Sequence, residues 1–202
     1  MTAITRLLRV STVVLAIAVP GLSQPDSQSE FARELIAAAL ERTNHDVTYD
    51  GSYRRIAYPG GDVPDNIGVC TDMVIRSYRA AGIDLQKRVH EDMSGAFSEY
   101  PQSWGHRRPD PNIDHRRVPN LQAYFRRRGA EIRISDNPDD YLPGDLVTWE
   151  LPANLTHIGI VSDRLSRDGK RRLILHNIGR GPEIDDILFE YPITGHYRYD
   201  GK

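Results

Sequence analysis

Two shortages in the sequence, of cysteine and of positive charge, exclude several classes of protein. Cys70 is the single cysteine among 202 residues, so no internal disulfide can form. Lys and Arg number 26 against 28 Asp and Glu, which gives a net charge of −2, and no aromatic platform is interleaved with the basic residues. We therefore expect no nucleic-acid partner.

Recognisable ligand-binding motifs are also missing. Gly60-Gly61 is not followed by Gly-Lys-Ser or Gly-Lys-Thr, so it is not a phosphate-binding loop of that kind. His90, Asp114 and His115 carry suitable metal ligands, but no pair of them has tight helical or zinc-finger spacing. We expect neither a metal nor another cofactor.

Long apolar runs are scarce, and the clearest one lies at the N-terminus. Arg6 and Arg9 precede an apolar run over residues 10–19, and small residues follow near residue 23. This pattern is typical of a secretory signal peptide over residues 1–23, and the run is short for a membrane span. We expect a periplasmic or secreted monomer with no stable membrane insertion after leader removal; an uncleaved anchor is the alternative.

The rest of the chain divides into a helical half and a strand-rich half. Residues 24–46 read as a polar leader followed by an amphipathic helix over 31–42. Residues 47–57 predict short extended segments around an Asp50-Gly51 turn. Apolar periodicity predicts further helices starting at Cys70 and covering 85–100 and 119–128.

Strands are predicted from Ile132 onward. The expected strands are 146–149, 157–161, 173–176, 187–191 and 196–199. Asp168-Gly169 is a hairpin signal between the second and third of them. Helices followed by strands predict an α+β fold, with N-terminal helices packed on an antiparallel sheet of about five strands and one domain over residues 47–202.

Cys70 stands where a loop rich in glycine and proline passes into a helix. The unpaired N–H groups and the dipole of a helix start stabilise an anion, so a thiol there ionises more easily. Asp72 in the same turn opposes this effect. A lone cysteine is often a small buried hydrophobe, but a leftover cysteine in an exported protein favours a reactive one.

Two histidines lie in strand-like settings downstream. If the strands fold back at Asp168-Gly169, His157 and His176 form a cross-strand pair. A slip of one residue would place Asn177 there instead. A cysteine nucleophile needs a base and a group that orients the base, which this pair would supply. Two unrelated histidines in an ordinary hairpin are the alternative.

Several short segments resemble the NlpC-type, papain-like cell-wall cysteine peptidases. They are Tyr58-Pro-Gly-Gly61, Cys70-Thr-Asp72, Ala80-Ala-Gly-Ile-Asp-Leu85, Pro143-Gly-Asp-Leu-Val147, His157-Ile-Gly-Ile160 and Leu175-His-Asn177. From about residue 49 to 199 the chain as a whole resembles an uncharacterised bacterial family within that superfamily. Val69 stands where the typical family has Asp, and Thr71-Asp72 replaces Ser-Gly, so the pocket beside the nucleophile differs.

The resemblance implies a papain-like fold and a set of roles. Cys70 would be the nucleophile, His157 the general base, and His176, or alternatively Asn177, the orienting group. Tyr58 would lie beside the nucleophile, and Asp72 would belong to its pocket. The implied reaction is attack of the thiolate on an amide carbonyl and hydrolysis of the acyl-enzyme, with peptidoglycan stem peptides as the usual substrate class.

Residues 104–128 are rich in arginine and histidine. His115, Arg116 and Arg117 could bind an anionic part of a substrate, since guanidinium groups suit carboxylate and phosphate. Charge runs more often face water and are pinned by ion pairs. A non-catalytic envelope protein of the same fold, which binds wall fragments through this segment, is the alternative to the enzyme.

Overall fold

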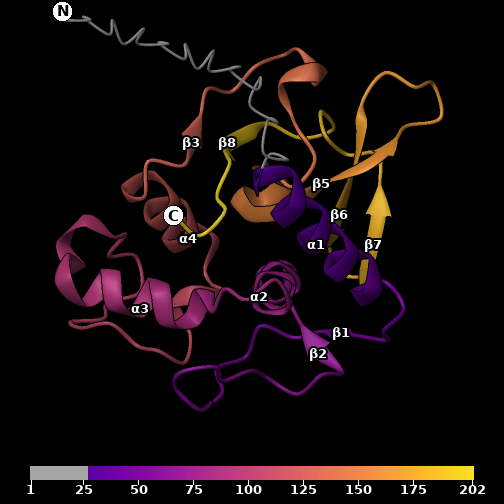
Figure 1. Cartoon of the computed structure of the whole chain (residues 1–202). Helices are drawn as coiled ribbons and strands as arrows, with labels where there is room; N and C mark the ends of the chain where they lie inside the picture. Colours follow the sequence, from indigo (N-terminus) through magenta and orange to yellow (C-terminus); the bar gives the residue numbers. More distant parts are fainter. Residues whose placement is uncertain (1–26) are drawn as a thin grey trace, which may run out of the picture.

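Helices and strands form separate parts of the fold, which the computed structural model describes for residues 27–202 (Figure 1). The predicted signal peptide over residues 1–23 lies outside the described residues. The helices are α1 (Ser27–Arg42), α2 (Cys70–Ala80), α3 (Leu85–Gly95) and α4 (Val118–Arg127). The strands are β1 (Thr48–Tyr49), β2 (Ile67–Gly68), β3 (Glu131–Ile132), β4 (Leu146–Leu151), β5 (Leu155–Leu165), β6 (Arg172–Asn177), β7 (Pro182–Asp185) and β8 (Ile193–Tyr197). The fold is mixed α+β, as predicted.

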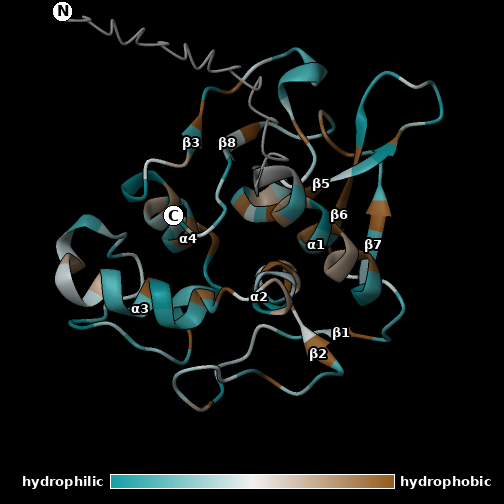
Figure 2. Cartoon of the chain, in the orientation of Figure 1, coloured by the Kyte–Doolittle hydropathy of each residue, from teal (hydrophilic) through white to brown (hydrophobic). Residues whose placement is uncertain are grey.

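The helix α2 lies at the centre of the helical part. All nine residues from Cys70 to Tyr78 are buried, because α2 packs against α1, α3 and the strand β5. Helix α3 is mostly hydrophilic (Figure 2), and only four of its side chains are buried. Gly82 ends α2 in the left-handed region, with φ 84°, which confirms the predicted stop. No helix in the described part is long and apolar enough to cross a membrane.

The main sheet has six strands in the order β3-β8-β4-β5-β6-β7, and every neighbouring pair is antiparallel. The hairpin predicted at Asp168-Gly169 joins β5 to β6, with Ser166 N–H donating to Arg171 O at 2.8 Å. The strand predicted over residues 187–191 is wrong, because those residues form a turn and β7 precedes them. A separate parallel pair, β1 and β2, lies beside α2 (Figure 1).

Both faces of the main sheet are covered. Side chains such as Ile158, Ile160 and Leu175 join the core shared with the helices. On the other face, Trp149 and Val161 belong to a second apolar cluster that is closed by the turn after β7. Trp149 Nε1 donates to Leu188 O at 3.0 Å, which holds that turn against the sheet. Ile187 and Leu188, which follow the edge strand β7, are thus buried although they do not form a strand.

Candidate active site

Cys70 is the first residue of α2, as the sequence predicts. Val69, the residue before it, is extended and caps the helix, and its N–H donates to Asp72 Oδ2 at 2.7 Å. The Cys70 side chain is only 4% exposed. The thiol therefore lies at a helix start but inside the protein.

Asp72, predicted as a pocket or orienting residue, is committed to other contacts. Besides capping α2, its carboxylate accepts hydrogen bonds from Arg116 Nε at 2.7 Å and from Arg116 Nη2 at 2.8 Å. Both side chains are almost fully buried. A buried, bidentate ion pair of this kind fixes the helix start relative to the segment that carries Arg116.

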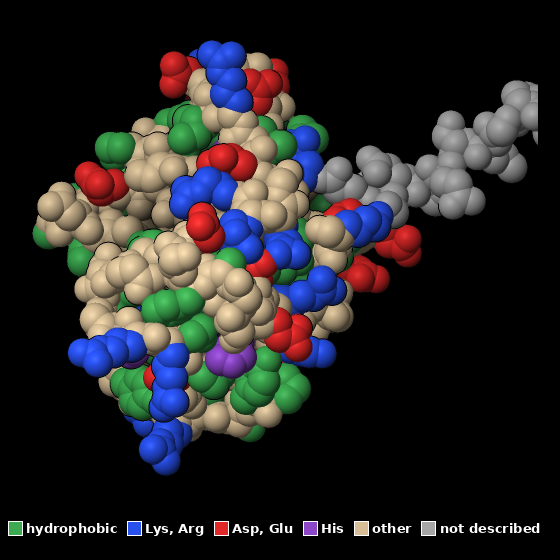
Figure 3. Space-filling model, turned by 90° about the vertical axis from the view of Figure 1, so that its left-hand side faces the viewer, with side chains coloured by type: hydrophobic (Ala, Val, Ile, Leu, Met, Phe, Trp, Pro, Cys, Tyr) green, Lys and Arg blue, Asp and Glu red, His purple; other side chains and the backbone are tan. Residues whose placement is uncertain are grey.

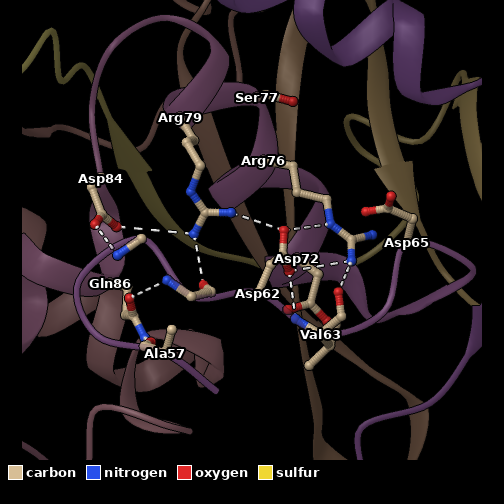
Figure 4. A network of polar contacts seen from close by, with 12 residues as sticks. Ala57, Asp62, Val63, Asp65, Asp72, Arg76, Ser77, Arg79, Asp84 and Gln86 are labelled. Carbon is tan, nitrogen blue, oxygen red and sulfur yellow. Dashed lines mark hydrogen bonds and ion pairs between the residues drawn. The ribbon is translucent and has the colours of Figure 1, made fainter.

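The loop before Cys70 is tied to α2 by a polar network (Figure 4). Arg76 Nε lies 3.0 Å from Asp62 Oδ2, and Arg79 Nη1 lies 2.8 Å from the same oxygen. Gln86 of α3 accepts from Gly61 N–H at 2.9 Å and donates to Ala57 O at 2.8 Å. The loop is therefore held in one shape, and that shape positions the start of α2.

The tyrosine beside the thiol is not the one that the resemblance implies. Tyr58 packs its ring edge-on against His90 of α3, with centroids 4.8 Å apart. Tyr49 of β1 instead has its hydroxyl against the Cys70 thiol, in a hydrogen bond that lowers the pKa of the thiol. Tyr49 pairs with Gly68, two residues before Cys70, in the β1–β2 ladder.

His157 and His176 meet on one face of the sheet. His157 Nε2 lies 3.1 Å from His176 Nδ1, and the two rings are nearly perpendicular at a centroid distance of 5.2 Å. The prediction that they stand directly opposite each other is wrong. Ile160 pairs with Leu175, so the register is shifted by two residues from the predicted one. A shift of two keeps both side chains on the same face, so the rings meet diagonally.

Asn177, the alternative orienting residue, has a different role. Its side-chain oxygen accepts from Gly179 N–H at 3.1 Å, which forms the turn after β6. As the residue next to His176 in a strand, it points to the other face. The ring that contacts His157 is therefore His176.

The thiol lies near the start of β5, where β5 and β6 separate. Cys70 belongs to the core shared with the helices, whereas the His157 ring contacts Trp149 of the second apolar cluster. The pairing of these strands ends at Ile160 and Leu175, so His157, Ile158 and His176 lie beyond the last paired residues. The backbone N–H of Ile158 contacts the thiol of Cys70 and lowers its pKa. Among the described residues no hydrogen bond joins Cys70 directly to His157 in this conformation.

Burial keeps all three groups neutral. It raises the pKa of the Cys70 thiol to about 11, despite the contacts from Ile158 and Tyr49. Burial, and then repulsion from His176, lowers the pKa of His157 to about 3. Burial also lowers the pKa of His176. The prediction of an easily ionised thiol is wrong for this structure, because burial raises the pKa of the thiol by more than the helix start lowers it.

Sequence comparison places the chain in a family. Residues 36–199 match the domain of unknown function DUF1287. The chain belongs to the DUF1287 family. The "Uncharacterized protein YijF" of Escherichia coli (strain K12) is 52% identical to it over 161 residues, which cover 80% of this chain and 78% of the relative. The matched range runs from α1 to the residues after β8, so this DUF1287 domain contains the whole constellation described above.

The basic segment of this DUF1287 domain is largely neutralised within the protein. Arg116 is buried against Asp72, so its guanidinium cannot reach a substrate in this conformation. Arg117 Nη1 lies 3.2 Å from Asp114 Oδ1, and its guanidinium stacks over Trp104. His115 is buried, and burial lowers its pKa to about 3. On the face shown in Figure 3, basic and acidic side chains are mixed over most of the surface.

Another buried histidine of the DUF1287 domain, His196, has a carboxylate partner that was not predicted. His196 Nε2 lies 2.7 Å from Asp145 Oδ2, and Arg198 donates to both oxygens of the same carboxylate. Asp145 also accepts from Leu142 N–H at 2.8 Å, which closes the turn of the Pro143-Gly-Asp motif. That motif was the sequence signal for this cluster. The described residues contain no group of three or more His, Cys, Asp or Glu side chains placed to hold a metal ion.

Proposed function

We propose that this DUF1287 domain is a cysteine hydrolase that cleaves an amide bond. The observation that carries the proposal is that the thiol contacts the backbone of β5 directly beside the residue that begins the histidine pair. The Cys70 thiol contacts the backbone N–H of Ile158, and His157 is the residue immediately before Ile158. His157 Nε2 in turn lies 3.1 Å from His176 Nδ1. A nucleophile, a base and an orienting ring are the parts that thiol catalysis needs.

We assign the roles of the two rings through one tautomer of the hydrogen bond between them. If His157 Nε2–H donates to His176 Nδ1, the Nδ1 atom of His157 is left without a proton and can accept the one from the thiol. The thiolate then attacks the carbonyl carbon. The His157 imidazolium returns its proton to the leaving amine, and water hydrolyses the thioester. His176 is neutral, so it orients His157 without supplying a negative charge.

The start of α2 supplies a donor for the developing oxyanion. The N–H groups of Val69 and Asp72 are bonded to Asp72 Oδ2 and Val69 O. The N–H of Cys70 has no protein acceptor in the described part of the chain. A preorganised amide at the nucleophile stabilises negative charge on a carbonyl oxygen in the transition state.

Peptidoglycan stem peptides are the substrate class that we propose. This choice rests on the NlpC-type segments around Cys70, His157 and His176, and on the leader-like N-terminus, which favours an exported protein that meets the cell wall. We extend the proposal to a papain-like arrangement, in which a helix that starts with cysteine packs on an antiparallel sheet. The order α2, β5, β6 along the chain is consistent with it.

A non-catalytic envelope protein of the same fold is the second candidate. The low exposure of Cys70 and its raised pKa favour this alternative, because a buried neutral thiol is a poor nucleophile. Such a protein would bind wall fragments without cleaving them, and its binding would not need Cys70.

The deciding experiment is mass spectrometry of purified peptidoglycan incubated with the protein and with Cys70→Ala. The hydrolase predicts muropeptide fragments that the variant fails to produce, while its urea midpoint stays close to that of the parent. Ser77→Ala, which removes a buried hydroxyl from the same helix, serves as the control and should retain activity. Retention of muropeptides by both proteins without any new mass would contradict the hydrolase and support the binding protein.

A further inference from the structure

The segment that crosses the solvent side of Cys70 is held by few interactions. We call residues 48–55 the strap. Every side chain of the strap is exposed except that of Asp50, which is half-buried. The buried Val47 precedes it, and Ile56, whose N–H donates to Asn112 Oδ1 at 3.0 Å, follows it. The strap can therefore move between two anchors without removing apolar side chains from the core.

One side chain of the strap separates the thiol from water. Tyr49 is 44% exposed, whereas Cys70 beneath it is 4% exposed. The Tyr49 hydroxyl contacts the thiol, while much of the remaining side chain faces solvent. On the inner side the thiol meets the amide of Ile158 and the apolar core. Displacement of the exposed Tyr49 would therefore uncover the sulfur without opening the apolar core.

The buried ion pair between Asp72 and Arg116 acts as a latch for the strap. The same guanidinium that bonds Asp72 also donates to Asp50 O at 3.3 Å and to Ser52 O at 3.2 Å. Two ladder bonds add to the attachment: Thr48 N–H to Asn66 O at 2.9 Å, and Asp50 N–H to Gly68 O at 3.2 Å. At the other end of the strap, the Tyr53 hydroxyl donates to Asp110 Oδ2 and accepts from Asn112 Nδ2, each at 3.1 Å. β1 and β2 lie together beside α2 in Figure 1. The latch therefore joins the strap to the helix that carries the nucleophile.

We propose that the strap is a gate, in which Tyr49 covers Cys70 when the latch holds the strap down and local release of the strap opens the thiol to substrate. The role in substrate entry rests on the proposed hydrolase, but the gate itself does not. Release breaks two ladder bonds and a few side-chain hydrogen bonds, including those from Arg116, but exposes no apolar core, so it should need less free energy than global unfolding. Entry of water also removes the burial that is the largest cause of the raised thiol pKa, which favours ionisation of Cys70.

The test is the rate of alkylation of Cys70 by iodoacetamide in the full-length protein, followed by intact mass. We expect Tyr49→Ala to react at least about tenfold faster than the parent, because local opening can occur at free energies near zero. Tyr49→Phe keeps the covering ring and should react no faster than the parent. Phe189→Ala truncates an aromatic side chain of similar exposure in the turn after β7, and should leave the rate unchanged.

Hydrogen exchange provides a second measurement that needs no substitution. The amides of Thr48 and Asp50 should exchange at rates that do not change in low urea, since their opening is local. Equal alkylation rates for Tyr49→Ala and the parent, or exchange of both amides only through global unfolding, would overturn the gate. Neither readout uses a substrate, so a failed gate would leave Cys70-dependent hydrolysis intact. A gate without hydrolysis would count against the proposed function alone.

Discussion

Two buried histidines of the main sheet, His157 and His196, have opposite surroundings. His196 faces a carboxylate: its Nε2 atom lies 2.7 Å from Asp145 Oδ2, and Arg198 neutralises the same group. His157 faces another imidazole, that of His176, and has no carboxylate partner. Both rings are almost inaccessible to solvent. The sheet therefore holds one histidine with fixed counter-charges and another without any.

The difference indicates which pair serves the fold. Asp145 joins His196, Arg198 and the turn that precedes β4, so it satisfies several buried donors at once. The His157–His176 contact satisfies one donor and ties together no loop. On the proposed function, a buried polar pair that contributes little to stability, and that follows directly along β5 from the residue contacting the thiol, serves chemistry rather than folding.

The largest expected effects distinguish the His157–His176 pair from the His196–Asp145 pair: a change at the first should mainly lower turnover, and a change at the second should mainly lower stability. We expect His157→Ala to lower the rate of muropeptide cleavage about 10²–10⁴-fold, the range for loss of a general base. Its stability should fall by only about 1–3 kcal/mol, the cost of leaving His176 Nδ1 unpaired. The two readouts are turnover by mass spectrometry and the urea midpoint.

Asp145→Ala is the matched change at the other pair. Loss of this carboxylate leaves Arg198 and His196 without their acceptor, and breaking a buried pair in this way costs ~3–5 kcal/mol. Turnover of the fraction that remains folded should change far less than in His157→Ala. A larger loss of stability in His157→Ala than in Asp145→Ala would reverse our assignment of the structural pair.

Glycines on the two strands permit a finer comparison. A Cβ added at Gly159, which lies opposite His176, would meet Ile174 Cγ2 at 2.6 Å and His176 Cβ at 3.2 Å. A Cβ at Gly195, next to His196, would meet the Tyr197 hydroxyl oxygen at 2.3 Å and ring carbon Cε2 at 2.6 Å. Overpacking of this kind costs about 1–3 kcal/mol.

We expect both variants, Gly159→Ala and Gly195→Ala, to lose stability by similar amounts, measured by urea unfolding. Only Gly159→Ala should also lower turnover, because it displaces the ring that orients His157. Equal turnover in the two variants would mean that His176 tolerates displacement and is not the orienting group.

Local periodicity predicts much of the helical half but less of the sheet. The helix signals around Leu35 and Leu121 are correct because those side chains are buried at helical spacing. The helix expected to reach residue 100 ends at Gly95, and a short 3₁₀ turn follows. The strand at 187–191 was wrong because Ile187 and Leu188 are apolar yet buried outside a strand, while the edge strand β7 carries two acidic residues and a proline.

The candidate site was less predictable where its contacts span the chain. Cys70 and His157 carry local signals: a helix start and a strand beside a hairpin. The pairing of Asp72 with Arg116 joins residues 44 positions apart, and no local pattern marks an arginine for burial. Tyr49 could not be distinguished from Tyr58, since its approach to the thiol depends on the β1–β2 ladder. The thiol pKa depends on burial, which spacing alone does not reveal.

A further expected effect is on the pH dependence of stability, and it arises from histidines that lack a carboxylate partner like that of His196. Burial lowers the pKa of His157 and of His115 to about 3, from an ordinary value of 6.5. Between these values the unfolded chain binds protons that the folded chain does not bind. Stability should therefore be full above the ordinary value and should fall as pH falls, by up to about 1.4 kcal/mol per pH unit for each histidine.

Urea midpoints between about pH 4.5 and 6.5 check this prediction, since most carboxylates in unfolded chains titrate below that range. Asp50, whose pKa its hydrogen bonds to Ser52 lower to about 2, contributes a loss of stability only at lower pH. His157→Gln removes one titrating group, so the fall of stability with falling pH should become less steep by the contribution of one histidine. His115→Gln should have the same effect. An acid limb in His157→Gln that overlays the parent would mean that His157 is already protonated in the folded protein. A charged His157 would need a counter-charge like that of His196, and the contrast between the two pairs would be lost.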